Sequence, residues 1–504
     1  MFVSTNPHLP PSHKFDDVPR AATENSCRKM DDCSGVRVDH SQAYGACLLA
    51  ARDFSAGEIV LAEKPSFLLN ACSPSPSAGL LAAVNNATKN AGSALTSQLA
   101  GILALWSSLP AKSRADMADG FFSTPDQSDM TAFLEGLIRD IQTRWMPLQE
   151  SEISSLIRAV QAWLLSAHVT DDDGAGLYRI GCRANSSCDP NIAFHSEPGT
   201  NRLIYRALRP IAADEELCFS YLVATELLMP THLRQQRLRA AKYFECGCER
   251  CRRVEDPDRA LPCSKTGGCD GQATPHRPRC TDGGESKPAG EADGTKAYWC
   301  CSKCGSNEPP SASTLEREDA LTRASLVGCG IDEAFVSLDG DVSWHRHWVW
   351  GELLWGSGVA KLRGGVEGGN DADVWAGVAL CKRYFAAVRS RGHPLHFVSS
   401  RAAEAYACLE ALALAASNGG HLDKAGAAAA AAVQLCAAYV PALEHEYGDA
   451  DAHNVRMRAF CRGHCGRCGS AASSRCSRCK LVGYCSAACQ KAAWKEHKDS
   501  CVQL

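Results

Sequence analysis

The C-terminal end of the chain carries eight cysteine and histidine residues at spacings typical of metal ligands. They are Cys465, Cys468, Cys476, Cys479, Cys485, Cys489, His497 and Cys501. Four such ligands form one tetrahedral zinc site, and residue pairs separated by two or three positions supply two ligands to the same ion. The segment is too short to bury a core of its own, so metal binding must supply most of its folding free energy. The sequence therefore predicts a finger that binds two zinc ions.

The rest of the chain is long enough for more than one domain. Of its 504 residues 45% are apolar and 22% charged, so most of it can fold around buried apolar surface. The formal net charge of -4 does not favour a globally basic nucleic-acid-binding protein. The 28 cysteines, without a secretory signal at the start, predict thiolate ligands and buried thiols rather than disulfides. No membrane span is expected, because the most apolar stretch, residues 425–443, is mostly alanine.

The hydrophobic pattern divides the chain into five segments. They are a disordered tail at 1–35, a β-rich domain at 36–225 with a helical insert at about 73–170, a cysteine-rich segment at 226–310 with a flexible loop between residues 272 and 296, a helical domain at 311–460, and the zinc finger at 461–504. Helices at 401–417 and 422–447, joined by a glycine turn, predict a tetratricopeptide-like pair. Strand-rich and helical segments that do not alternate predict an α+β fold.

Two further groups of cysteines precede the helical domain. They are the triplet Cys246, Cys248 and Cys251, and the quartet Cys263, Cys269, Cys301 and Cys304. The triplet supplies three ligands from a tight turn and lacks a nearby fourth ligand, which zinc requires. The quartet resembles a zinc ribbon that spans the flexible loop, with Cys300 as an alternative to Cys301. These groups predict a third zinc ion and allow a fourth.

Four segments and the finger resemble the SET and MYND domain family of protein-lysine methyltransferases. The segments are YGACLLAARDFSAGEIVLAE from Tyr44, GLYRIGCRANSSCDPN from Gly176, LRPIAADEELCFSYL from Leu208 and YFECGCERC from Tyr243. The finger resembles the MYND finger in the order and spacing of its eight ligands. In the best-known members the MYND finger lies inside the SET region, whereas here it lies at the C-terminus. The resemblance implies a SET-type β-fold at 36–225, a post-SET zinc segment after it, and methyl transfer from S-adenosylmethionine to a lysine of a histone or another protein.

The resemblance also assigns the metal ligands to individual ions. In the finger it implies two sets, Cys465, Cys468, Cys485 and Cys489 on one ion and Cys476, Cys479, His497 and Cys501 on the other. It further implies that Cys188 completes the zinc site of the triplet. Spacing alone could not have chosen these sets.

Donor-binding and catalytic residues follow from the same resemblance. Those implied to contact S-adenosylmethionine are Gly45, Ala46, Cys47, Asn185, Ser186, Tyr221 and Phe244. Tyr221 is also the implied catalytic residue, at the point where the methyl donor meets the lysine channel. The reaction is an in-line displacement by a neutral amine, so alignment and removal of water matter more than a strong base. The hydroxyl group of Tyr221 can orient that amine.

The sequence departs from the family's pattern at three places. The donor loop Gly-x-Gly reads Gly45, Ala46, Cys47, and the Asn-His-Ser-Cys motif reads Asn185, Ser186, Ser187, Cys188. Lys242 stands where an aromatic residue of the substrate channel is usual, and a cation there would repel a protonated lysine. These departures bear on turnover more than on fold.

Two other functions stay open. In the first, the SET fold has lost turnover and the chain is a zinc-stabilised scaffold in transcriptional regulation, whose finger and helical layer bind proline-containing or extended peptides. Donor binding and its dependence on Tyr221 would distinguish the enzyme from this scaffold. In the second, the basic finger makes the chain a DNA-binding regulator. We expect a monomer, resident in the nucleus, the cytoplasm or both. Its partner is a protein for the enzyme and the scaffold, and nucleic acid for the DNA-binding regulator.

Overall fold

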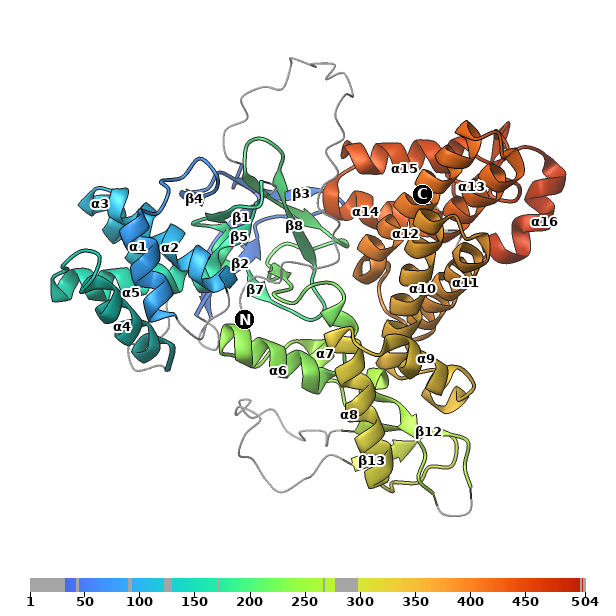
Figure 1. Ribbon diagram of the computed structural model, residues 1–504, viewed down its shortest axis with the longest axis horizontal. Coiled ribbons are helices and arrows are strands. Elements are labelled where there is room, and N and C mark those ends of the chain that lie inside the picture. Colours follow the sequence, from blue (N-terminus) through green and yellow to red (C-terminus); the bar gives the residue numbers. More distant parts are fainter. Residues whose placement is uncertain are drawn as a thin grey trace. The chain divides into compact units, whose positions relative to one another are not determined.

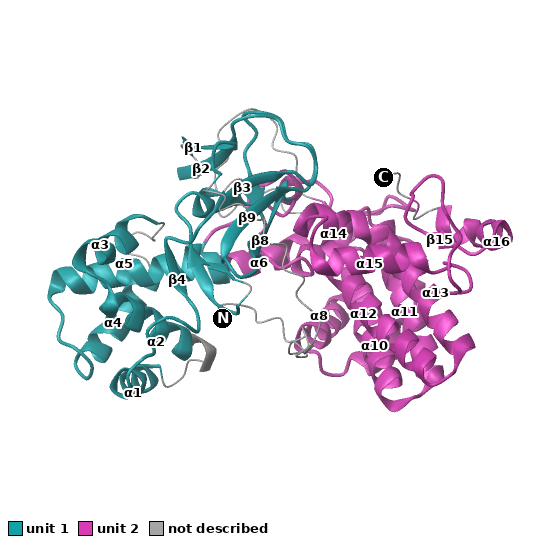
Figure 2. Ribbon diagram, turned by 90° about the horizontal axis from the view of Figure 1, so that it is seen from above, with its two compact units in different colours: residues 1–186, 190–219, 240–243 teal, residues 187–189, 220–239, 244–504 magenta. Residues whose placement is uncertain are grey.

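The computed structural model describes residues 32–41, 45–88, 93–121, 129–170, 172–265, 268–276, 298–498 and 501. The chain forms two compact units (Figures 1 and 2). Unit 1 consists of residues 1–186, 190–219 and 240–243, and unit 2 of residues 187–189, 220–239 and 244–504. Most of the expected disordered tail lies outside the described residues. Its last part does not: the backbone N–H of Asp32 donates to the carbonyl oxygen of Ala62 at 2.9 Å.

The strands of unit 1 form several small sheets rather than one large one. They are the antiparallel pair β1 (Val36–Ser41) and β2 (Gly45–Ala50), the sheet β3 (Ile59–Glu63), β9 (Arg202–Ala207) and β8 (Ile192–Glu197), the sheet β4 (Phe67–Leu69), β6 (Ala175–Leu177) and β5 (His168–Val169), and the parallel pair β7 (Asn185–Ser186) and β10 (Cys218–Phe219). In the first pair Val36 lies opposite Ala50, and in the second sheet Ile192 lies opposite Ala207. β3 pairs with β9 and β4 pairs with β6, so strands that precede the helical insert in the sequence pair with strands that follow it.

The helical insert has its own core. Its helices are α1 (Ala78–Ala87), α2 (Ser93–Ser108), α3 (Ala111–Asp119), α4 (Asp129–Gln142) and α5 (Glu150–Ser166). α5 begins with a capping box, in which the side chain of Glu152 accepts from the N–H of Gln149 at 3.0 Å. Trp106 and Trp163 are each 1% exposed, because apolar residues recur at helical spacing on the inner faces.

Unit 2 begins with the cysteine-rich segment. It contains the 3-10 helix η2 (Glu226–Leu228), α6 (Thr231–Lys242), whose last residues belong to unit 1, α7 (Glu249–Arg252), η3 (Pro257–Arg259), and the sheet β11 (Leu261–Pro262), β12 (Gln272–His276) and β13 (Tyr298–Cys301). The prediction of a flexible loop from residue 272 is wrong for its first five residues. These form β12, because Ala273 and Thr274 are buried and pair with β13. Residues 277–296 of that loop lie outside the described residues.

The helical domain is a layer of paired helices. In order these are α8 (Ala312–Val327), α9 (Ile331–Asp339), η4 (Val342–Trp344), α10 (Trp348–Gly368), α11 (Asp371–Ser390), η5 (Leu395–Val398), α12 (Ser399–Asn418), α13 (Leu422–Cys436), η6 (Ala437–Tyr439), α14 (Val440–Tyr447) and α15 (Ala452–Gly463). Figure 1 shows α10 to α13 as neighbouring helices. The predicted helix 422–447 is interrupted after Cys436, since Pro441 has no N–H to continue the helical bonds and lies instead in the first turn of α14, which begins at Val440.

One stretch among the described helices is long and apolar enough for a membrane span. It is Leu422–Tyr447, within which an 18-residue window has a mean hydropathy of 1.5, and 72% of that window is buried inside the structure. Its buried alanines pack on α12 and α11, as in the core of a helical layer.

Candidate zinc centres and active site

The finger brings its eight ligands together in two sets. Cys465, Cys468, Cys485 and Cys489 form one set and Cys476, Cys479, His497 and Cys501 the other, and within each set the ligand atoms lie within 4.8 Å of one another. These are the two sets that the resemblance implies. Helix α16 (Ala487–His497) follows the two-strand pair β14 (Ser474–Arg475) and β15 (Gly483–Tyr484). The N-cap side chain of Ser486 accepts from the N–H of Cys489 at 3.2 Å, which fixes where the ligand-bearing helix begins.

The distances inside these sets fit tetrahedral zinc. Four sulfur ligands, each about 2.3 Å from a zinc ion, lie about 3.8 Å from one another. The sulfur atoms of Cys476 and Cys501 are 3.7 Å apart, and those of Cys468 and Cys485 are 3.5 Å apart. The sulfur of Cys479 is 3.6 Å from Nε2 of His497. Both sets therefore have the donors and spacing of structural zinc sites.

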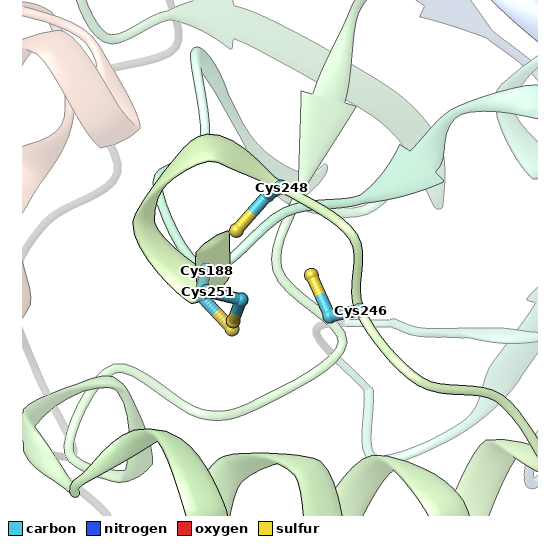
Figure 3. Close-up of side chains that lie close together, drawn as sticks. All are labelled: Cys188, Cys246, Cys248 and Cys251. Carbon is cyan, nitrogen blue, oxygen red and sulfur yellow. The ribbon is translucent and has the colours of Figure 1, made fainter. Parts of the chain in front are cut away.

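A third set joins a distant cysteine to the triplet that follows α6. Figure 3 shows the side chains of Cys188, Cys246, Cys248 and Cys251 converging, and their sulfur atoms lie within 4.8 Å of one another. Cys188, Cys246 and Cys251 are buried, at 1%, 4% and 2% exposed. Cys188 is therefore placed to be the fourth ligand that the triplet lacks, and the set fits one zinc ion.

Side chains from α6 and α7 hold this third set in place. The amide of Gln235 donates to the carbonyl oxygen of Cys246 and accepts from its N–H, each at 2.7 Å. Nη2 of Arg234 lies 3.8 Å from the sulfur of Cys251, and Nη1 of Arg250 donates to the carbonyl oxygen of Cys188 at 3.0 Å. Sequence reasoning missed these supporting residues. Of these residues, only Arg250 could have been noticed in the sequence, because it lies between the ligands Cys248 and Cys251.

The fourth set is the ribbon-like quartet. The sulfur atoms of Cys263 and Cys304 are 3.7 Å apart and those of Cys269 and Cys301 are 3.9 Å apart. The hairpin of β12 and β13 brings the two halves together. The quartet takes Cys301, which is buried, and not the alternative Cys300. Its distances also fit tetrahedral zinc.

The predicted donor loop lies at the start of β2 in unit 1. Gly45 has a φ of +72°, and a Cβ atom added there would meet no atom within 4 Å. The backbone beside Gly45 is thus open, as close approach of a ligand requires. Cys47, which replaces the second glycine, is buried, at 6% exposed. The N–H of Leu217 donates to the carbonyl oxygen of Leu48 at 2.8 Å, which ties β2 to the segment before β10.

Asn185 and Ser186 form β7, which lies beside β10. Asn185 is paired with Cys218, and its Nδ2 donates to Oε1 of Glu216 at 2.8 Å. The side chain of Asn191 clamps the same segment, because its Oδ1 accepts from the N–H of Cys218 and its Nδ2 donates to the carbonyl oxygen of Glu216, each at 2.8 Å. The segment 216–218 therefore contacts both β2 and β7, the two predicted donor-binding strands of unit 1.

Tyr221 and Phe244 meet in unit 2. Their ring centroids are 6.0 Å apart at an interplanar angle of 81°, an edge-to-face contact between two half-buried side chains. Tyr243, which precedes Phe244, has a φ of +63°, a conformation uncommon outside glycine. Cys246 of the third cysteine set follows two residues later. The set thus fixes the chain beside this aromatic pair.

Lys242 is held by the end of the helical insert. Its Nζ donates to the carbonyl oxygens of Leu165 at 2.9 Å and Leu164 at 3.4 Å, in the last turn of α5. Burial lowers the pKa of Lys242 from its ordinary value to about 8. A cation at a helix C-terminus also faces the negative end of the helix dipole. Lys242 is thus held against the C-terminal end of α5.

Comparison with known proteins agrees with the C-terminal finger and the β-rich domain. The SET domain family model matches residues 45–222, and the MYND finger model matches residues 464–501. Protein-lysine N-trimethyltransferase SMYD5 of Gallus gallus is 41% identical over 88 residues, which are 17% of this chain and 21% of that protein. Histone-lysine N-methyltransferase SMYD3 of Mus musculus is 41% identical over 87 residues, 17% of this chain and 18% of that protein. The matches thus span about a fifth of these relatives.

Among solved structures, the SET domain of LSMT bound to lysine and AdoHcy covers 72% of this chain and 87% of its own. The sequence identity is 13% and the TM-score 0.27. The resemblance drawn from the sequence is confirmed by the two family models and by the curated relatives. The chain therefore contains a SET domain and a C-terminal MYND finger, and its homologues are protein-lysine methyltransferases of the SET and MYND type.

Proposed function

We propose that the protein is an S-adenosylmethionine-dependent protein-lysine N-methyltransferase. The observation that carries this proposal is the third cysteine set, which joins Cys188 to Cys246, Cys248 and Cys251. Asn185 lies three residues before Cys188, and Phe244 lies two residues before Cys246. One metal centre therefore fixes the chain next to both predicted donor-binding segments. The matched relatives are named as lysine methyltransferases, which supports the same reaction.

The residues proposed to hold the donor fit that role. Gly45 offers open backbone, and Phe244 offers an aromatic face next to Tyr221. The full proposed set is Gly45, Ala46, Cys47, Asn185, Ser186, Tyr221 and Phe244. The bound donor would supply a methyl group on a positively charged sulfur, which can be transferred without a strong base. Cys47 stands where the family has its second glycine. Its side chain is buried in the protein, so the substitution is compatible with donor binding at this loop.

The task of the protein's own residues is alignment and the exclusion of water. A substrate lysine has an ordinary pKa of about 10.4 and reacts only as the neutral amine. The hydroxyl group of Tyr221 would accept a hydrogen bond from that amine and direct its lone pair. Phe244 would shield the reacting atoms from water, which strengthens the polar interactions that remain. The proposed substrate class is a lysine of a histone or of another protein.

A second candidate function is a peptide-binding scaffold without turnover. Within unit 2, a groove with a volume of about 430 Å³ lies where the MYND finger meets the helical layer. Its lining includes the apolar side chains Phe385, Val433 and Val482 and the polar side chains Tyr484 and Gln434. A mixed lining of this kind suits an extended peptide.

Calorimetric titration of the zinc-loaded protein with S-adenosylmethionine tests the proposed enzyme. We expect binding with a Kd of about 1 to 100 μM, weakened about tenfold in Phe244→Ala because a stacking surface is lost. Phe335→Ala is the matched control, since Phe335 is also a half-buried ring of unit 2 but stacks on Trp350 instead, with centroids 5.6 Å apart. Absence of binding by folded protein would overturn the proposal and favour the scaffold.

A further inference from the structure

Two buried arginines lie beside the third cysteine set. Arg234 is 1% exposed and Arg250 is 8% exposed, although arginine is seldom buried without a partner. Their guanidinium groups approach the set through the sulfur of Cys251 and the carbonyl oxygen of Cys188. Four thiolates around one zinc ion carry a net charge of minus two, and such a charge needs compensation inside a protein.

A buried carboxylate lies on the other side of these arginines. Asp258 of η3 is 2% exposed, and its Oδ2 accepts from Nη2 of Arg250 at 3.1 Å and lies 3.9 Å from Nη1 of Arg234. Its Oδ1 faces the helical domain, where it lies 2.7 Å from Nε2 of His393 and 3.8 Å from Nη1 of Arg391. One oxygen therefore faces the zinc side and the other faces the connection between α11 and α12.

Asp258 is ionised in this environment. Burial alone would raise its pKa, but the hydrogen bond from His393 and the charges of Arg391 and Arg250 outweigh burial and hold the pKa well below its usual range. Burial also lowers the pKa of His393, although the hydrogen bond to Asp258 and the charge of that carboxylate act in the opposite direction. Acidic and basic groups at the rim of the adjoining cavity of about 270 Å³ are Asp189, Arg253, Glu255 and Asp256.

Arg234 and Arg250 therefore lie between two negatively charged groups, the thiolates of the zinc-loaded set and the carboxylate of Asp258. These two groups share the same guanidinium groups, and removing one partner of a buried ion pair leaves the remaining charge uncompensated.

We propose that Asp258, Arg391 and His393 form a buried clamp that joins the third zinc centre to the helical domain. Arg391 and His393 occupy one oxygen of Asp258, which leaves Arg234 and Arg250 available to the thiolates on the other side. The ring of Phe397 packs under Arg250, with the guanidinium carbon 5.3 Å from the ring centroid, and comes from the same connection. Arg391 and His393 are thus positioning residues for the metal centre, and their role does not depend on the proposed methyl transfer.

The clamp predicts that a substitution in the helical domain weakens a metal site that it does not touch. In Arg391→Met, Asp258 should draw Arg234 and Arg250 away from the thiolates. Timed alkylation followed by mass spectrometry should show the peptides that carry Cys188, Cys246, Cys248 and Cys251 reacting about tenfold faster, the scale expected for loss of a supporting residue. The peptides of the MYND finger should react as in the wild type.

Arg401→Met is the matched control. Arg401 is also a buried arginine of the helical domain, with Glu352 and Tyr384 as partners, and it lies in a different ion-pair network. It should lower stability without selective reaction of the third set. Equal patterns in the two variants, or no change in Arg391→Met, would overturn the clamp.

Two further measurements test the clamp if Arg391→Met does not fold. Arg391→Lys keeps the charge and should react at an intermediate rate. In the wild-type protein, a chelator that removes zinc should raise hydrogen exchange in residues 389–398 in step with alkylation of the third set. Unchanged exchange in that connection after zinc has left the third set would also contradict the clamp.

Discussion

At the scale of single residues, the structure gives Lys242 contacts that the sequence does not predict. Sequence alone placed a cation where an aromatic residue is usual. In the structure, its Nζ donates to the carbonyl oxygens of the last turn of α5, and burial lowers its pKa to about 8. Since the position of that turn could not be read from spacing, the sequence could not predict this partner.

The stability of the protein should therefore depend on pH through Lys242. The folded-state pKa of about 8 lies below the ordinary value of 10.5, so between these values the unfolded chain binds more protons. The free energy of unfolding of the wild type, relative to Lys242→Met, should rise with pH across this window by about 1 kcal/mol per pH unit. Denaturant titrations from pH 7 to pH 10 measure it, and a flat difference would mean that Lys242 titrates normally.

At the scale of elements, the helices α10 and α11 pack closely against each other at Gly377. A Cβ atom at Gly377 would lie 2.6 Å from the backbone nitrogen of Leu362 and 2.7 Å from the carbonyl oxygen of Gly358. Gly377→Ala should therefore destabilise the protein by about 2 kcal/mol, because the helices would have to separate. Thermal or denaturant unfolding measures the change.

Gly364→Ala in α10 serves as the control for that packing. A Cβ atom at Gly364 would meet nothing within 4 Å, so alanine should instead stabilise the helix by about 0.5 to 1 kcal/mol. If both substitutions had the same sign, the close contact at Gly377 would not be what holds the hairpin together.

The elements also show what could be predicted from the sequence. The MYND ligand sets, the third cysteine set and the helical insert follow from local spacing and periodicity together with the family resemblance. The hairpin of α10 and α11 did not stand out, because its seam is built from glycines that carry no apolar signal. The sequence predicts a loop at β12, because the pairing of this strand with β13 is long-range and leaves no local pattern.

At the scale of the whole molecule, the chain crosses between the two units several times. Residues 187–189 and 220–239 belong to unit 2, although they lie within or directly after the segment that the sequence assigned to the SET domain. The set of Cys188, Cys246, Cys248 and Cys251 depends on this crossing. Dividing the sequence into consecutive domains cannot predict this crossing. The contact between Asp258 and His393 could not be predicted either, because the two residues are 135 positions apart.

Metal analysis tests this organisation directly. The purified protein should contain four zinc ions per chain, one for each set, and the MYND finger should lose its fold when a chelator removes them. Re-addition of zinc should restore the far-ultraviolet circular dichroism spectrum. Two ions per chain, with the cysteines of the third set still open to alkylation, would remove the basis for both the donor-site proposal and the clamp.

The central claim is that this SET domain transfers methyl groups to lysine. The most direct measurement is transfer of isotope-labelled methyl from S-adenosylmethionine to histones and cell-extract proteins, with the modified residue identified by mass spectrometry. We predict labelled lysine with the wild type and a loss of about a hundredfold in kcat/KM with Tyr221→Phe, because the amine loses its alignment. No labelled lysine from a zinc-loaded, folded protein that binds the donor, or full activity in Tyr221→Phe, would contradict this account.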